Sequence, residues 1–239
     1  MDAYGALTAR AYAAYRPPLH QLILAGLLDR CYARGLDYGC GTGQSAHALA
    51  DYCKEVVAVD GSPAMLERAL PGARIAYRLQ EGEDIAVSGK VFDLITLAGV
   101  LPYCKSQAFL DRLVGVCRPG ARIVIYDFNC ELLSGDDWLY PPPRPVASYD
   151  HAIDFTGLQL RGMQSIDKRH QTLSLELTAQ QLTYLALADS DNVAAFAREL
   201  GHDKLVPRVR KRLQEYYGIE DTYPVAFTTY STQYQLNSA

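Results

Sequence analysis

The stretch Leu36-Asp37-Tyr38-Gly39-Cys40-Gly41-Thr42-Gly43-Gln44-Ser45 places three glycines between a short strand and a helix. Glycine reaches positive φ without steric cost and lets the backbone approach a ligand closely. The spacing is G-x-G-x-G, whereas nicotinamide enzymes bring a pyrophosphate to a helix N-terminus with G-x-G-x-x-G. Asp37 lies just ahead of the turn, where a carboxylate repels a phosphate and attracts an ammonium. The turn therefore suits a ligand that carries a positive charge nearby.

Outward from this turn, short β-rich runs alternate with helix-length segments. Strands are predicted at 35–38, 56–60, 74–79, 92–97 and 122–128, and helices at 44–52, 63–70 and 105–117. Such alternation is typical of a parallel sheet with crossover helices. The chain is thus expected to be an α/β protein.

The flanking segments have other patterns. Residues 1–30 are predicted as a helical lead-in interrupted at Arg16-Pro17-Pro18, because proline removes a backbone donor and disfavours helix just before it. Beyond the core, 136–145 is proline-rich and 172–178 alternates with period two, as a half-buried antiparallel strand does. We expect a lid or substrate-binding insertion over 129–190, helices at 179–188, 192–200 and 206–217, and a last strand at 225–236. All of this fits one domain, 1–239.

The second predicted strand, Val56-Val57-Ala58-Val59, ends in Asp60, about 20 residues after the first glycine of the turn. A carboxylate at this place can accept hydrogen bonds from both hydroxyls of a ribose. The alternative is that Asp60 caps the helix that begins at Pro63, because Asp-x-x-Pro is a reasonable helix start.

Four motifs in order resemble those of class I S-adenosylmethionine-dependent methyltransferases. They are Leu36-Asp-Tyr-Gly-Cys-Gly-Thr-Gly43, Val57-Ala-Val-Asp-Gly-Ser-Pro-Ala-Met-Leu66, Phe92-Asp-Leu-Ile-Thr-Leu-Ala-Gly-Val-Leu101 and Val116-Cys-Arg-Pro-Gly-Ala-Arg-Ile-Val-Ile-Tyr-Asp127. They cover about residues 36 to 128. The resemblance implies a Rossmann-like, mainly parallel seven-stranded sheet of order 3-2-1-4-5-7-6, with strand 7 antiparallel, helices on both faces and a lid after strand 5.

The resemblance also implies a site for S-adenosylmethionine, with S-adenosylhomocysteine as product. Asp37 and the backbone around Gly39, Gly41 and Gly43 would hold the methionyl part, Asp60 the ribose, and Gly61 and Met65 one face of the adenine. Glu83 or Asp84 would contact the adenine amino group, although both also fit solvated loop acids. The remaining implied contacts are Ala98, Gly99 and Val100 beside the sulfonium, and Tyr12, Tyr15 and Arg16 closing over the cofactor, where core packing explains the tyrosines equally well.

An activated methyl needs little acid–base machinery, because the protein mainly holds a lone pair in line with the S–CH₃ bond. Asp127, at the carboxyl end of the fifth strand, is the leading candidate for an acceptor contact, with capping as the alternative. Tyr103 could touch the acceptor or the cofactor. His151 is a candidate general base, although a lone histidine often has only structural hydrogen bonds. The expected reaction is methyl transfer to O or N of a small molecule, with no metal.

The residues also bear on other functions. A peptide or carrier-bound acceptor stays open, as does a non-catalytic protein that binds S-adenosylmethionine, although the intact glycines and Asp60 argue against the latter. The glycine spacing and Asp37 oppose a nicotinamide oxidoreductase. Leu101-Pro102-Tyr103 only partly resembles the Asn- or Asp-Pro-Pro-Tyr motif of nucleic-acid and glutamine methyltransferases, and Cys104 follows Tyr103 where an RNA cytosine enzyme would need Pro-Cys.

Composition sets further bounds. The 239 residues carry a net charge of −4, 49% are apolar and 21% charged, which is typical of a folded globular protein and argues against general affinity for nucleic acid. The basic run Lys204 to Arg212 fits a solvated helix face. No secretory signal or membrane-length apolar run is seen, so a cytoplasmic protein without membrane contact is expected. Its expected oligomeric state is a monomer or a homodimer. The six cysteines lack metal-ligand spacing and are expected to be reduced thiols.

Overall fold

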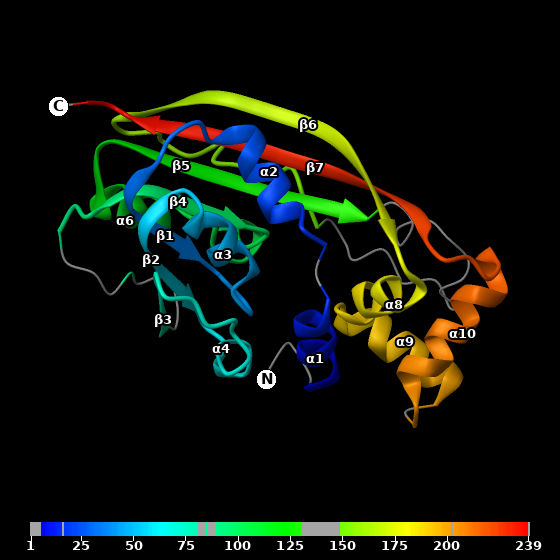
Figure 1. Ribbon diagram of the computed structural model, residues 1–239. Coiled ribbons are helices and arrows are strands. Elements are labelled where there is room, and N and C mark those ends of the chain that lie inside the picture. Colours follow the sequence, from blue (N-terminus) through cyan, green and yellow to red (C-terminus); the bar gives the residue numbers. More distant parts are fainter. Residues whose placement is uncertain are drawn as a thin grey trace. The chain divides into compact units, whose positions relative to one another are not determined.

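A computed structural model describes residues 6–15, 17–80, 85, 89–130, 149–201 and 203–238 (Figure 1). Its sheet has seven strands in the order β3-β2-β1-β4-β5-β7-β6. Their bounds are β1 Tyr32–Tyr38, β2 Cys53–Asp60, β3 Ile75–Leu79, β4 Phe92–Ala98, β5 Cys117–Cys130, β6 Met163–Leu177 and β7 Tyr223–Leu236. This confirms the expected fold class and strand order.

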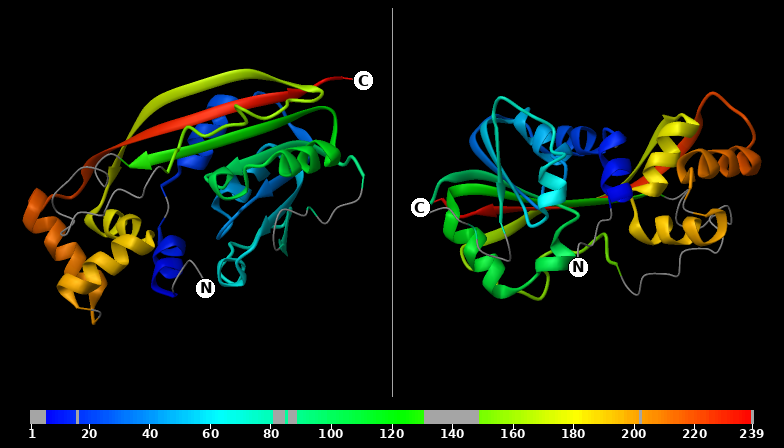
Figure 2. Two further views of the ribbon diagram at one scale, coloured as in Figure 1. Left: turned by 180° about the vertical axis from the view of Figure 1, so that it is seen from behind. Right: turned by 90° about the horizontal axis from the view of Figure 1, so that it is seen from below.

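Strands β1 to β5 run parallel, and β7 runs against β5, as Figure 1 shows. The apolar runs of β1, β2, β4 and β5 explain this, because parallel strands are covered on both faces. Their residues Leu36, Val57, Ile95 and Ile123 share one buried cluster with Phe109. In the right view of Figure 2, helices α2 (Leu19–Leu27) and α3 (Gln44–Ala50) cover one face and α6 (Gln107–Val116) the other.

Side-chain caps decide where two helices begin. Ser106 accepts a hydrogen bond from Phe109 N at 3.0 Å and starts α6, so the predicted helix at 105–117 begins later and is preceded by a separate short helix, α5 (Leu101–Cys104). Ser62 caps α4 (Pro63–Leu66) in the same way. The alternative that Asp60 caps this helix is therefore wrong, because the capping hydroxyl comes from the residue directly before Pro63.

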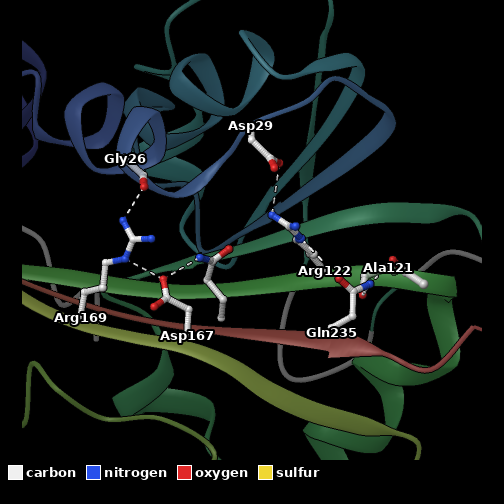
Figure 3. A network of polar contacts seen from close by, with 9 residues as sticks. Gly26, Asp29, Ala121, Arg122, Asp167, Arg169 and Gln235 are labelled. Atoms are coloured by element: carbon white, nitrogen blue, oxygen red, sulfur yellow. Dashed lines mark hydrogen bonds and ion pairs between the residues drawn. The ribbon is translucent and has the colours of Figure 1, made fainter.

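Two polar networks attach the sheet to the segment around α2 (Figure 3). Arg169 on β6 donates to the carbonyl oxygen of Gly26 at 2.5 Å and forms an ion pair with Asp167 at 2.7 Å. Arg122 on β5 lies 3.6 Å from a carboxylate oxygen of Asp29. These contacts join residues far apart in sequence, so only the folded chain reveals them.

The chain divides into two compact units. The larger comprises 18–128, 150–171 and 229–239 and holds most of the sheet. The smaller comprises the described parts of 1–17, 129–149 and 172–228, with helices α1 (Ala6–Ala14), α8 (Ala179–Leu187), α9 (Ser190–Leu200) and α10 (Leu205–Tyr217). Within it α8 contacts α1, α9 and α10, and begins with a capping box between Thr178 and Gln181.

Several predictions for this part of the chain extend beyond the described residues. The insertion expected at 129–190 includes 131–148, which lie outside them, so the lid stays a prediction. Among the described residues, no helix combines the length and the apolar character that a membrane crossing requires.

Candidate functional site

The glycine-rich turn lies where the strand order of the sheet reverses. β1 pairs with β2 on one side and with β4 on the other, so the strand order continues in opposite directions from this point. Ligands of open α/β sheets bind in such a crevice, at the carboxyl ends of the strands. The two loops touch here: a Cβ at Gly39, whose φ is +75°, would lie 2.4 Å from Val100 Cγ2. Only glycine permits this approach.

Backbone hydrogen bonds fix the turn to β2. The N–H groups of Gly39 and Cys40 donate to the carbonyl oxygen of Val59 at 2.8 and 3.0 Å. Gly41 N donates to Asp60 Oδ2 at 2.8 Å, and Ser62 N donates to Asp60 Oδ1 at the same distance. Asp60 therefore joins the glycine turn to the loop after β2. It is half-buried, and each of its oxygens keeps a lone pair for a further donor.

Asp37 lies beneath the turn and has no exposed surface. Its carboxylate accepts hydrogen bonds from Ser45 Oγ at 2.5 Å and Thr96 Oγ1 at 2.8 Å, which connects β1 with α3 and β4. Burial raises the pKa of Asp37 to about 6, although the two hydroxyls lower it in part. In this geometry Asp37 holds the turn from below.

Tyr77 and Thr42 belong to the same site, and sequence reasoning missed both. A Cβ at Gly43, whose φ is +88°, would lie 2.1 Å from the Tyr77 hydroxyl, which donates to the carbonyl oxygen of Leu70 at 2.8 Å. Thr42 Oγ1 is buried and has no hydrogen-bond partner among the described residues. The position of Tyr77 beside Ala58 of β2 follows from strand pairing, for which the sequence carries no local signal.

The other predicted cofactor residues fall at the same edge or outside the described part. Met65 in α4 is buried, and Gly61 is exposed. A Cβ at Gly61 would lie 3.4 Å from the Gln80 carbonyl oxygen. Ala98, Gly99 and Val100 follow β4 and are half-buried. Tyr15 is half-buried in the smaller unit. Outside the described part are Arg16, Glu83, Asp84 and the side chain of Tyr12.

Two of the three predicted acceptor residues come together. His151 Nδ1 lies 2.8 Å from Asp127 Oδ2, while Asp127 Oδ1 accepts a hydrogen bond from Phe128 N at 2.8 Å. Tyr103 is 72% exposed on α5. The sequence offered Asp127 and His151 as separate candidates, and their pairing is visible only in the fold.

His151 lines a cavity of about 190 Å³ in the larger unit, and aromatic rings line part of it. The rings of His151 and Tyr230 stack with centroids 6.1 Å apart, and those of Tyr230 and His170 stack at 4.7 Å. Lys168 and Arg169 also line the cavity. Within the described residues no cluster of three or more histidine, cysteine or acidic side chains has the arrangement of a metal site.

Comparison with known proteins places this site in context. Residues 36–125 match a family model described as a methyltransferase domain. A demethylmenaquinone methyltransferase of Clavibacter sepedonicus is 38% identical over 101 residues, which are 40% of this chain and 41% of that protein. A ubiquinone biosynthesis O-methyltransferase of Xanthomonas axonopodis pv. citri is 28% identical over 144 residues, or 54% of this chain and 60% of that protein.

The chain spans about half the length of the curated relatives it matches. Structural likeness is broader: a solved structure of a candidate type II methyltransferase from Anaeromyxobacter dehalogenans superposes with a TM-score of 0.69. This match covers 94% of this chain and 98% of that chain at 19% identity, so it shows a shared fold.

Proposed function

We propose that the protein is an S-adenosylmethionine-dependent methyltransferase that methylates O or N of a small-molecule acceptor. Residues 36–125 match a methyltransferase domain, and the sheet has the strand order expected of the class I enzymes. The observation that carries the proposal is the Asp60 carboxylate. It is fixed by Gly41 N and Ser62 N at the edge of the crevice, one residue past the apolar run of β2. This is the place from which an acid reaches ribose hydroxyls.

The residues present fit S-adenosylmethionine. The three glycines of the turn have φ between +53° and +88°, a backbone conformation that glycine adopts without steric cost. The half-buried Asp60 can accept two more hydrogen bonds, one on each oxygen, as a ribose diol requires. Thr42 Oγ1 offers a buried hydroxyl that a ligand group at the turn would satisfy.

Each group has a separate task in this proposal. When bound, S-adenosylmethionine supplies an activated methyl group. Asp60 orients the ribose, and Asp37 supports the turn through Ser45 and Thr96. Gly99 and Val100 connect the turn with β5: Val100 contacts Gly39 of the turn, and Gly99 N donates to the Tyr126 carbonyl oxygen at 3.0 Å. Asp127, Tyr103 and His151 are the candidates for contact with the acceptor, for which in-line alignment is the main requirement.

The relatives support a small-molecule acceptor. Two of them are named a demethylmenaquinone methyltransferase and a ubiquinone biosynthesis O-methyltransferase. The cavity lined by His151, about 190 Å³, is of a size that suits part of a small molecule.

Calorimetric titration with S-adenosylhomocysteine, run beside NADH, tests the proposal on wild type, Asp60→Ala and the exposed control Asp51→Ala. We expect micromolar binding of S-adenosylhomocysteine alone. Asp60→Ala removes at least two hydrogen bonds to a charged acceptor, each worth about 1.5–3 kcal/mol, so affinity should fall about 100-fold or more. Asp51→Ala should bind like wild type, since Asp51 lies at the far end of α3.

Two results would count against the proposal. One is folded wild-type protein that fails to bind S-adenosylhomocysteine, and the other is preferential binding of NADH. Equal affinity of the Asp60 and Asp51 variants would remove Asp60 from the site while leaving the ligand assignment intact.

A further inference from the structure

We propose that the larger unit holds a second ligand site, which binds an oxyanion group, phosphate or carboxylate, of a small molecule. The site is an open cavity of about 580 Å³ at the amino ends of the parallel strands. The glycine turn follows the carboxyl end of β1, so the two sites lie at opposite ends of the strands. The second site is therefore separate from the proposed methyl-donor site, and neither depends on the other.

Four strands of the sheet contribute to the cavity. Its lining comes from the amino ends of β1 and β4, the first half of β5, the end of β7 and the residues just after it, and includes Tyr32, Asp93, Gly120, Arg122, Gln235 and Ser238. Pockets for small molecules have volumes of about 300–1,000 Å³. The cavity is thus of a size that holds a small organic molecule.

Arg122 is a largely buried cation with few polar contacts (Figure 3). Only 18% of its side chain is exposed. Its Nε donates to Gln235 Oε1 at 3.4 Å, and its Nη1 lies 3.6 Å from Asp29 Oδ1. A guanidinium has five N–H donors, yet no other hydrogen-bond or ion-pair partner of this side chain lies among the described residues. Because a poorly paired buried charge is costly, an anionic oxygen in the cavity would stabilise it.

The amide of Gln235 has a fixed orientation. Its Nε2 donates to the carbonyl oxygens of Gly120 and Ala121, which leaves Oε1 as the single acceptor toward Arg122. This oxygen is neutral, and 3.4 Å is long for an N–H···O hydrogen bond. An anion would bind the guanidinium more strongly than this amide does.

Arg30 adds a second positive charge to the lining of the cavity. Its guanidinium carbon lies 5.0 Å from the centroid of the Tyr32 ring, which is a cation–π distance. Tyr32 is 5% exposed, so its ring is a fixed support for this guanidinium. Within the described part of the chain, no carboxylate lies at ion-pair distance from Arg30. Its charge can therefore pair with a ligand.

The acid that lines the cavity, Asp93, already has partners. Its Oδ2 accepts a hydrogen bond from Arg34 N at 2.9 Å, and Arg118 Nη1 lies 3.2 and 3.3 Å from its two oxygens. The Arg118 guanidinium thus offsets the charge of this carboxylate, and Asp93 does not repel an anion as an unpaired acid would.

The charges at the cavity sum to a local positive excess. The carboxylate of Asp29 is 77% exposed, so water weakens its pairing with Arg122. Arg30 and Arg122 together therefore outweigh this one screened acid, in a chain whose net charge is −4. A local excess of one sign favours a ligand of the opposite sign.

The class of ligand follows from the donors. Guanidinium groups form paired, planar hydrogen bonds with the oxygens of phosphates and carboxylates. Ser238, which also lines the cavity, adds a hydroxyl donor. A cationic ligand would meet two positive charges, and an apolar ligand would leave the donors of Arg122 unsatisfied. Phosphate and carboxylate share the required chemistry, and titration with both distinguishes them.

Isothermal titration calorimetry of the full chain tests the site, with sodium phosphate and sodium succinate as probes at an ionic strength matched with sodium chloride. The variants are Arg30→Gln, Arg122→Gln and the control Arg78→Gln, which removes the same charge from an exposed residue of the edge strand β3. We expect wild type to bind at least one probe saturably. Arg30→Gln and Arg122→Gln should each weaken binding about tenfold or more, because a charged donor is lost, and Arg78→Gln should bind like wild type.

Two further readouts locate the bound probe. In backbone amide NMR the probe should shift signals of residues 30–33 and 119–122 and leave those of 39–45 unchanged. S-adenosylhomocysteine should bind equally well with and without the probe. Because Arg30 is exposed, Arg30→Gln should fold like wild type even where Arg122→Gln does not. Tighter binding of phosphate would identify the ligand group as a phosphate, and tighter binding of succinate would identify it as a carboxylate.

Four results would overturn the second site. They are no saturable binding of either probe by wild type, equal affinity of wild type and Arg30→Gln, signal shifts confined to the glycine turn, and equal weakening by Arg30→Gln and Arg78→Gln. The last result would show general attraction of anions to the surface. Failure of S-adenosylhomocysteine to bind would instead count against the proposed function and leave this site untouched.

Discussion

Asp37 and Asp60 end neighbouring strands, yet their surroundings give them opposite tasks. Asp37 is fully buried and bonded to two hydroxyls, whereas Asp60 is half-buried and bonded to two backbone N–H groups. A charged hydrogen-bond acceptor at the crevice can bind a ligand directly, whereas the described contacts of Asp37 support the turn, and its contact with the cofactor stays a prediction. Residue type and spacing alone made both acids candidates for cofactor contact.

The buried position of Asp37 predicts a pH dependence of stability. Its pKa is raised from 3.8 to about 6 in the folded protein, so between about pH 4 and 6 the folded state binds a proton that the unfolded chain has released. The contribution to the free energy of unfolding is therefore present at low pH and falls by about 3 kcal/mol as pH rises through this range.

Asp37→Asn should remove this decline. Urea unfolding of wild type and variant from pH 4 to 7 measures it: the wild type should lose stability relative to the variant as pH rises. Two curves that stay parallel over the range would contradict the assignment of the slope to Asp37.

At the scale of elements, the turn between β1 and α3 is covered by side chains from β3 and from the loop after β4. Tyr77 fills the space at Gly43 and Val100 fills that at Gly39. Each glycine is thus required both by its backbone conformation and by a close neighbour.

The closeness of Tyr77 can be separated from the conformation by a matched pair. Gly43 and Gly157 both have φ of +88°, but a Cβ at Gly157 would meet nothing within 4 Å. Both alanine variants bear the cost of a left-handed residue, about 1–2 kcal/mol. The free energy of unfolding of Gly43→Ala should be lower than that of Gly157→Ala by about 1–3 kcal/mol, because Tyr77 must move.

Chemical denaturation measures both variants, and S-adenosylhomocysteine titration should show weakened binding only for Gly43→Ala. Equal losses of stability in the two variants would mean that Tyr77 yields without cost.

At the scale of the whole molecule, the last strand of the chain lies inside the sheet. β7 is inserted between β5 and β6, and most of its residues are buried. The sheet that positions the turn is therefore complete only when the last segment of the chain has joined it.

Truncation tests this dependence. A chain that ends at Asp221 lacks β7 but retains the whole glycine turn and Asp60. We expect it to show no cooperative thermal transition by circular dichroism and no S-adenosylhomocysteine binding, since β5 and β6 lose their common neighbour. A chain that ends at Asn237 should fold like wild type, because it keeps the backbone bonds of Asn237 to Gly120 and Gly162. Cooperative unfolding of the shorter chain would show that strands β1 to β5 are stable alone.

The sequence by itself determined the strands of the parallel core, the glycine turn and the place of Asp60. These are local properties: apolar runs specify buried strands, and glycine spacing specifies a turn. The strand order came from the resemblance of four motifs to a known family. The same local rules also predict Ser62 as the cap of α4, because serine is a preferred capping residue and it directly precedes Pro63; on the sequence alone, only Asp60 was considered for this role.

Only the tertiary structure decided what lies around those elements. Tyr77 over Gly43, the burial of Asp37, and the pairing of Asp127 with His151 against Tyr230 depend on strand neighbours and on which face a side chain occupies. Such contacts join segments separated by whole elements, and their energy depends on the assembled sheet. No spacing within the chain encodes them, because the residues become neighbours only after their strands have taken their places in the sheet.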